Sequence, residues 1–380
     1  MQDIPIRFYL RKHQFLPLFR EERQKGEIAQ VVSDAHAVWL SVFLKNGSED
    51  NAVIQGRHGS SILIFFHPNV AAGELVASYT DVCTKLEEKG VGASVGLAMY
   101  PFLSFGRADV EACALKALEY AMLLPRPRVG VCNSLAFNIS ADRLYSLGDF
   151  LGALQEYRLA LLIDEDNAMA WNSMGVCVAA MGRKKEARAH FLEALKRKAD
   201  LEQRAEILYN LGTLCQSLGE IPEAYAYLQQ CVELDSGHLY AWIRLGQLCE
   251  HEGKTNEAKR MYENGAAVEE REGYASSSAK RHLAQVALQQ NHVDEARTIL
   301  QNVLQHNPQD AAAMLLLAKI YLDGGEDPSI AEMLARKSVR LEPKPEAWQV
   351  LAQALRLLGK EEAASYADAK GFFHEAERGF

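Results

Sequence analysis

Two six-residue segments that lie 71 residues apart, Ala170-Trp-Asn-Ser-Met-Gly175 and Ala241-Trp-Ile-Arg-Leu-Gly246, decide the fold of this chain. Between them, Ile207-Leu-Tyr-Asn-Leu-Gly212 follows the same pattern with leucine in place of tryptophan. Each segment is followed seven residues later by glycine and five residues after that by alanine. A period of about 34 residues, with large, small and turn positions in a fixed order, indicates an array of helical hairpins.

The same order of residues recurs in seven units. Each unit carries a large residue at its fourth position, a small residue at its eighth and a turn residue at its fifteenth. Small residues let two antiparallel helices approach closely, and a large one fills the space against the next unit. Asn291 takes the turn position of the fifth unit, because asparagine tolerates the left-handed backbone that glycine supplies elsewhere. The fourth-position residues that set the register are Phe137, Trp171, Leu208, Trp242, Met314 and Trp348.

This pattern resembles the tetratricopeptide repeat (TPR) over roughly residues 134–375. The resemblance implies an all-α superhelix at residues 133–380, built from about seven helix-turn-helix units. It also implies that a protein or peptide partner binds along the concave surface, which is lined by the first helix of each unit.

Polar residues at the positions of that first helix that face the concave surface are the candidate partner-binding residues. Amide side chains can hydrogen-bond a peptide backbone in any register, and arginine can bind a carboxylate with two N–H groups. A merely solvated face is the alternative. The clamp that holds the carboxylate of chaperone tails is not matched, because Asn172 is followed four residues later by Val176. The candidates are Asn138, Asn172, Tyr209, Asn210, Arg244, Gln247, Arg281 and Gln285.

The first 132 residues follow a different pattern, in which short apolar runs alternate with helical stretches. Ser61–Phe66 and Val91–Met99 have the length and composition of strands, and Val129–Cys132 fits a closing strand. Helices are predicted at about 71–88 and at Ala108–Leu123, where apolar residues recur three and four apart. Strands and helices in this order predict an α+β domain at residues 1–132.

This region resembles the C-terminal half of a GGDEF domain, the diguanylate cyclase fold, over about residues 50–132. The segments that carry the resemblance are Ala93–Pro101, Leu115–Ala121 and Arg128-Val129, and His58–Ile62 stands where the family has its signature hairpin. The resemblance implies a bacterial signalling context. A cyclase of this family needs carboxylates to hold two divalent cations on the triphosphate. The hairpin here has none, so we interpret the domain as a degenerate cyclase-like domain whose first strand is missing.

Composition excludes several other functions. The formal net charge is −9, and residues 1–133 carry 14 basic and 14 acidic side chains, so the acidic excess lies on the repeats. A nucleic-acid partner would need a clustered basic face. No apolar run is long enough to span a membrane, and no histidine or cysteine spacing predicts a metal or a cofactor. The seven cysteines form no Cys-x-x-Cys pair, and Gly253-Lys254-Thr255 is predicted to be a turn between helices rather than a phosphate loop.

The sequence therefore predicts a cytoplasmic scaffold or adaptor without catalytic residues, which recruits a protein or peptide through the repeats. One alternative stays open. In it, the degenerate cyclase-like domain still binds guanine nucleotide or a cyclic dinucleotide, and the chain acts as a nucleotide-responsive receptor.

Overall fold

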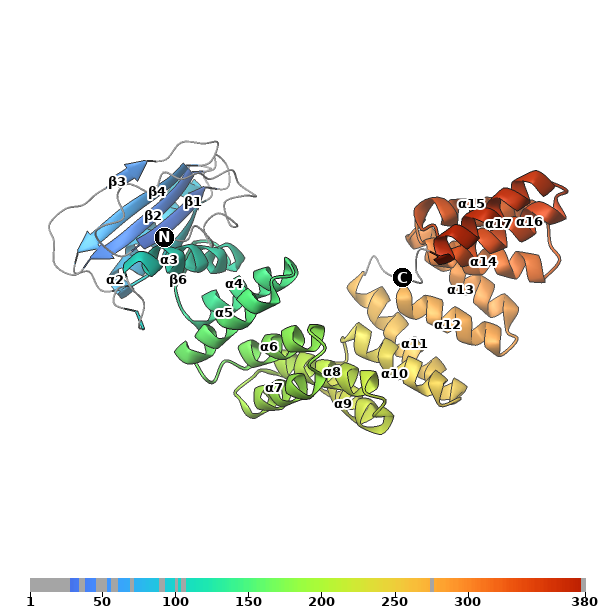
Figure 1. Cartoon of the computed structure of the whole chain (residues 1–380), viewed down its shortest axis with the longest axis horizontal. Coiled ribbons are helices and arrows are strands. Elements are labelled where there is room, and N and C mark those ends of the chain that lie inside the picture. The colour runs from blue at the N-terminus through green and yellow to red at the C-terminus, as the bar shows by residue number, and fades with distance from the viewer. Residues whose placement is uncertain are drawn as a thin grey trace. The chain divides into compact units, whose positions relative to one another are not determined.

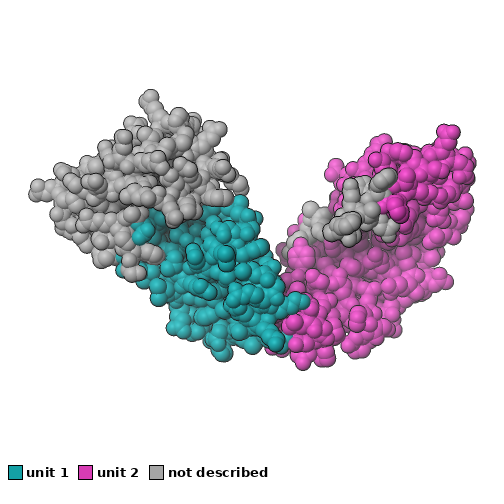
Figure 2. Space-filling view, in the orientation of Figure 1, with its two compact units in different colours: residues 1–203 teal, residues 204–380 magenta. Residues whose placement is uncertain are grey.

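The computed structural model describes residues 28–33, 38–45, 53–55, 61–68, 72–88, 93–99, 102–103, 107–273 and 277–376. The chain divides into two compact units, Met1–Gln203 and Arg204–Phe380, which are coloured separately in Figure 2. The division falls inside the repeats, within helix α8. The predicted boundary at residue 132 concerns the change from strands to repeats and remains a prediction.

Six described strands of the first unit form one sheet in the order β3-β4-β2-β1-β5-β6 (Figure 1). Strand β1 pairs antiparallel with both β2 and β5, and β3 pairs antiparallel with β4. The pairs β2–β4 and β5–β6 are parallel. The strands are β1 (Ile28–Ser33), β2 (Val38–Lys45), β3 (Val53–Gln55), β4 (Ser61–Pro68), β5 (Ala93–Leu97) and β6 (Arg128–Val131).

Helices α2 (Ala72–Glu88) and α3 (Arg107–Leu123) pack on opposite faces of β5 and β6. Val95 and Leu97 point toward α2, where they meet a buried cluster with Leu75. Gly96 lies between them and therefore points the other way, since successive residues of a strand face opposite sides. A Cβ on Gly96 would stand 2.4 Å from the carbonyl oxygen of Ala114 on α3. The glycine in this strand therefore allows the backbone of α3 to pack directly against the backbone of β5.

The strands predicted near residues 61–66, 91–99 and 129–132 and the helices predicted near 71–88 and 108–123 are confirmed as β4, β5, β6, α2 and α3. The expectation of a missing first strand is wrong, because β1 and β2 both precede the β3–β4 pair. In the sequence, the mostly apolar residues of these two strands form one nearly continuous run, interrupted by residues 34–37, and the two strands were therefore not predicted. The predicted signature residues 58–60, which connect β3 to β4, lie outside the described residues.

In the described part of the chain, seven helical hairpins follow one another, as the sequence predicts (Figure 1). Each hairpin turns at a residue with positive φ, including Gly253 at 72° and Asn291 at 63°, so the turn assigned to asparagine is confirmed. The hairpins are α4 (Ser134–Ser146) with α5 (Phe150–Ile163), α6 (Ala168–Ala180) with α7 (Lys184–Lys196), α8 (Leu201–Ser217) with α9 (Ile221–Leu234), α10 (Leu239–His251) with α11 (Thr255–Glu272), α12 (Ser278–Gln289) with α13 (Val293–His306), α14 (Ala311–Asp323) with α15 (Pro328–Leu341), and α16 (Pro345–Leu357) with α17 (Glu361–Ala376).

The tightest contact inside a hairpin joins the eighth position to the large residue of the second helix. A Cβ on Gly175 would lie 2.6 Å from the ring of Phe191, and one on Gly246 would lie 2.4 Å from the ring of Tyr262. The fourth-position tryptophans are less enclosed than the pattern suggests. Trp242 is half-buried, and its Nε1–H donates to the carbonyl oxygen of Ser236 at 2.9 Å. In the first, second and fourth hairpins a second-helix aromatic, Tyr157, Phe191 or Tyr262, therefore forms the centre of the hairpin.

The α+β region joins the first hairpin directly, within the first compact unit. Only Cys132 and Asn133 separate β6 from α4, and the Asn133 side chain accepts from the Ala136 N–H to cap that helix. Lys116 on α3 forms a largely buried ion pair with Glu156 on α5, with 2.9 Å between Nζ and Oε1. The same ammonium lies 4.5 Å from the ring centroid of Phe137 on α4. Helix α3 thus packs against the first hairpin as a neighbouring repeat helix would.

Candidate functional site

The predicted site residues of the first compact unit are buried. Asn138 on α4 is 6% exposed and Asn172 on α6 is 4% exposed. The Asn138 amide donates to Asp142 at 2.9 Å, and Asp142 also accepts from the Tyr157 hydroxyl at 2.6 Å. Burial raises the pKa of the Asp142 carboxyl against these hydrogen bonds. Both asparagine amides therefore belong to the packed interior in this structure, and neither is presented to solvent.

Helix α8 carries two predicted residues that contact the start of the next hairpin. The half-buried ring of Tyr209 packs against the ring of His238 in a tilted arrangement, with 4.7 Å between centroids and 35° between planes. The Nδ1 of His238 accepts from the Ala241 N–H at 3.2 Å, so its Nε2 carries the proton and donates to Glu206 at 3.3 Å. Asn210 donates to the same carboxylate at 3.5 Å. These contacts hold the α8 side chains in place at the beginning of α10.

Helix α10 has an open stripe. Tyr240, Arg244, Gln247 and His251 follow one another at spacings of three and four and are exposed or half-buried, and Trp242 and Glu250 are half-buried outside this stripe. The remaining residues of the helix from Ala241 to Cys249 are buried. The Arg244 guanidinium donates to the side-chain oxygen Oε1 of Gln247 at 3.4 Å, near the upper limit for a hydrogen bond. Two predicted residues, Arg244 and Gln247, thus lie together on the open side of the helix.

A polar network connects this stripe to α12 above the ring of Tyr262. Gln247 Nε2 lies 3.4 Å from His282 Nε2, and the His282 ring stacks on Tyr262 with centroids 4.9 Å apart and 10° between planes. The Tyr262 hydroxyl donates to Glu250, which also accepts from Gln289 at 3.2 Å. Burial lowers the pKa of His282, although Glu250 nearby opposes that shift.

The sequence analysis did not identify this network. A signal was available in the pairing of a tyrosine at the second-helix aromatic position with a carboxylate on the open side of the first helix. Tyr157 with Asp142 and Tyr262 with Glu250 both follow this rule.

Arg281 and Gln285, the predicted residues of α12, have different surroundings. Arg281 forms an ion pair with Asp310, whose side chain is 3% exposed, and also donates to Ser278 at 3.0 Å. Asp310 caps α14 by accepting from the Ala313 N–H at 2.9 Å. The Arg281 guanidinium therefore connects two hairpins in this structure. Gln285 is exposed beside His282, with which it forms a hydrogen bond.

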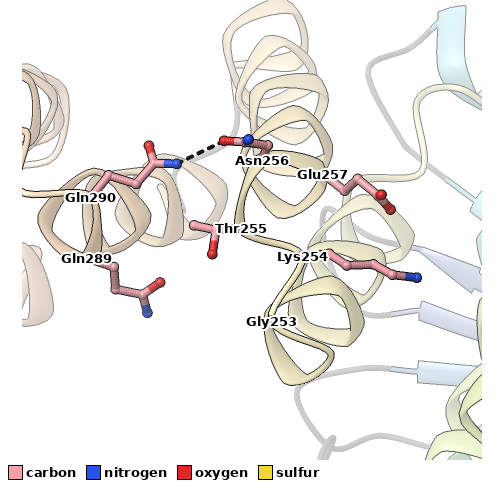
Figure 3. Close-up of a pocket in the computed structure, with 7 residues that line it drawn as sticks. All are labelled: Gly253, Lys254, Thr255, Asn256, Glu257, Gln289 and Gln290. Carbon is pink, nitrogen blue, oxygen red and sulfur yellow. Dashed lines mark hydrogen bonds between the residues drawn. The ribbon is translucent and has the colours of Figure 1, made fainter.

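A hollow of about 480 Å³ lies where the α10–α11 turn meets the end of α12. Figure 3 shows its polar lining, in which Gln290 donates to Asn256 at 3.1 Å. Gly253, Lys254 and Thr255 form the turn and the first residue of α11, so the predicted turn is confirmed. The residues that line the hollow are Gly253, Lys254, Thr255, Asn256, Glu257, Gln289 and Gln290.

Metal-binding clusters, membrane-spanning helices and cysteines complete the description of functional groups in the described residues. Within them, no three histidine, cysteine or acidic side chains converge to hold a metal ion. None of the helices described there is long and apolar enough to cross a membrane. All seven cysteines fall in that part of the chain, and each is a buried free thiol. Cys215, Cys231 and Cys249 lie in the packed interior of the repeats.

Comparison with known proteins identifies the repeats. Two family models, both described as tetratricopeptide repeat, match this chain, one at residues 166–237 and the other at residues 252–320 and 287–354. The photosystem I assembly protein Ycf3 of Rippkaea orientalis is 31% identical over 99 residues, which is 24% of this chain. The matched segment spans 57% of the length of Ycf3.

Solved structures similar to this chain include PilF and YrrB. PilF of Pseudomonas aeruginosa has a TM-score of 0.47 and 21% identity, over 55% of this chain and 92% of that one. YrrB, described as a TPR protein with an unusual peptide-binding site, has a TM-score of 0.37 and 24% identity, over 48% of this chain and 90% of that one. With the family model, the hairpin geometry and the residue register in agreement, this chain contains tetratricopeptide repeats.

Proposed function

We propose that this chain is a non-enzymatic scaffold that recruits a protein partner through the open sides of the first helices of its repeats. The proposal concerns the second compact unit, where Tyr209, Asn210, Arg244, Gln247 and Gln285 are exposed or half-buried. TPR folds serve as protein-binding surfaces, and the matched relative is named as an assembly protein. Asn138 and Asn172 are buried in the first compact unit, and Arg281 connects α12 to the start of α14 through Asp310.

The observation that carries the proposal is the open stripe of α10. Tyr240, Arg244, Gln247 and His251 form one face of α10 that a partner can reach, whereas most other residues of the helix are buried. Tyrosine and arginine are the residue types that most often dominate binding energy at protein interfaces. Because α10 sits between packed hairpins, these side chains are held on a rigid support.

The test compares two pairs of alanine substitutions in the full-length chain. Tyr240→Ala with Gln285→Ala removes two exposed side chains from the open sides of α10 and α12. Gln229→Ala with Gln230→Ala removes two exposed side chains from α9, a second helix. Proteins that co-purify with each variant from the cells that make the chain are measured by quantitative mass spectrometry. We expect a specific partner to be lost from the first variant alone. Equal retention in both variants would show that the open sides are not the binding surface.

We also propose that residues 1–132 form a degenerate cyclase-like domain in a cytoplasmic protein. The order β4-α2-β5-α3-β6 supports this assignment, since it is the order that the GGDEF resemblance implies. Incubation of the purified chain with GTP and magnesium or manganese should yield no cyclic dinucleotide. Product formation above that of a buffer blank would overturn the non-enzymatic assignment.

A further inference from the structure

We propose that the partner segment bound at α10 is acidic and that Arg244 is the residue that selects it. This inference rests on the proposed function and deepens it by assigning the chemistry of the partner. It is argued from the charges of the first helices in the second compact unit, taken over the described residues.

The first step concerns the cations on the three first helices that follow α10. Lys280 on α12 pairs with Glu270 at 2.8 Å, and Arg281 pairs with Asp310. Lys319 on α14 pairs with Glu346, and Arg356 on α16 pairs with Asp368. All four charges are therefore already matched by carboxylates of the chain itself.

Arg244 differs from these four. Among the described residues, the Arg244 guanidinium makes a long hydrogen bond to the side chain of Gln247, which is neutral, and it forms no ion pair. The carboxylate of Glu250, the one acidic residue of α10, receives hydrogen bonds on both oxygens, one from Tyr262 and one from Gln289. The half-buried guanidinium thus keeps its charge and most of its five N–H donors for a group from outside the chain.

The surroundings of Arg244 are suited to a peptide. Tyr240 is 54% exposed one turn before it and offers an aromatic surface, and the exposed amide of Gln285 offers a donor and an acceptor for a peptide backbone. A carboxylate can accept two parallel N–H bonds from one guanidinium, and lysine cannot reproduce that geometry. The site therefore favours an extended segment that places an aspartate or glutamate on Arg244.

The charge of the second helices supports the same placement. Helices α9, α11 and α13 carry nine acidic and four basic residues within their bounds, whereas α10 and α12 carry one acidic and three basic. Because Lys280 and Arg281 are already paired with carboxylates of the chain, an acidic segment is attracted to Arg244, and the acidic second helices repel it.

The experiment uses the full chain and three pools of fluorescein-labelled twelve-residue peptides built on the same random background. The pools contain two aspartates, two asparagines or two lysines at the same positions. Fluorescence anisotropy is measured at low and at high salt. We expect tight binding of the aspartate pool alone, weakened by at least about tenfold in Arg244→Gln, less in Arg244→Lys, and weakened for all variants at high salt.

Arg260→Gln is the matched control, since Arg260 is an exposed arginine on the second helix α11. It removes the same charge from another face and should leave binding unchanged. Equal losses in Arg244→Gln and Arg260→Gln would reduce the effect to net charge and overturn the assignment. No preference for aspartate over asparagine would also overturn it. If the alanine pair on α10 and α12 loses a cellular partner while Arg244→Gln keeps it, the proposed function stands and the acidic selectivity is wrong.

Discussion

Arg281→Ala should destabilise the second compact unit, because it leaves a buried carboxylate without its counter-charge. The Asp310 side chain is 3% exposed and the Arg281 side chain is 26% exposed. Removing one partner of a fully buried ion pair costs about 3–5 kcal/mol. Two features reduce this cost. Arg281 is partly exposed to solvent, and Asp310 still accepts the Ala313 N–H after the substitution. We therefore expect a loss of about 2–3 kcal/mol in the free energy of unfolding.

Thermal denaturation of the full chain, followed by circular dichroism, measures this loss. For a cooperative body of this size, 1 kcal/mol corresponds to about 2–4 °C in Tm, so the shift should be about 4–12 °C. Hydrogen exchange should rise first in α12 and α14, since each repeat contacts only its neighbours. Arg244→Ala removes the same side chain from an unpaired position and should change the stability by no more than about 0.5 kcal/mol.

A double-mutant cycle separates the ion pair from general effects of the substitution. Asp310→Asn keeps a side chain that can cap α14 but removes the charge. In the Arg281→Ala background it should therefore recover part of the lost stability. Two results would contradict this account of Arg281. One is an equal Tm for Arg281→Ala and Arg244→Ala. The other is a further loss of stability, as large as the first, when Asp310→Asn is added to Arg281→Ala.

Three further predictions concern packing, pH and thiols. Gly246→Ala should lower the free energy of unfolding in urea by about 1–3 kcal/mol despite its gain in helix propensity, because the new Cβ would lie 2.4 Å from the Tyr262 ring; an unchanged midpoint would mean that the hairpin relaxes freely. Burial lowers the pKa of His282 in the folded chain, so the unfolded chain binds more protons there, and stability should fall as the pH drops below about 6.5; His282→Gln should flatten that dependence, and an identical pH profile would contradict it. Burial raises the pKa of Cys231 to about 12, and all seven cysteines are buried, so a disulfide reagent at pH 8 should titrate seven thiols only after denaturation; rapid labelling of the native chain would contradict this.

The sequence predicts the repeats well because each helical contact is local. The eighth-position glycine and the aromatic sixteen residues later belong to one hairpin, so their register is visible in a single unit. The extent to which Trp242 is buried was less predictable, because its ring N–H also donates to the Ser236 carbonyl oxygen in the loop before α10. The two strands at Ile28–Ser33 and Val38–Lys45 were missed because their apolar residues form one nearly continuous run.

The candidate site was predicted only as a set of positions. Register places Asn138 and Arg281 on first helices, but it does not reveal that one is buried and that the other meets Asp310, 29 residues away. Both observations depend on contacts between side chains of different helices. These contacts vary with the residues inserted between repeats and with the identity of each neighbouring residue. The network at Tyr262, Glu250 and His282 was missed for the same reason, since it joins three helices.

Site-specific photo-crosslinking tests the central claim most directly. A photoreactive phenylalanine analogue is placed at Gln285 on the open side of α12 or, as a matched control, at Gln230 on α9; both glutamines are exposed. After irradiation of living cells that make the full chain, crosslinked peptides are identified by mass spectrometry. The account predicts that Gln285, and not Gln230, crosslinks to a defined segment of one partner protein, and that Tyr240→Ala reduces the yield. Crosslinks that form only from Gln230, or equally from both positions, would contradict it.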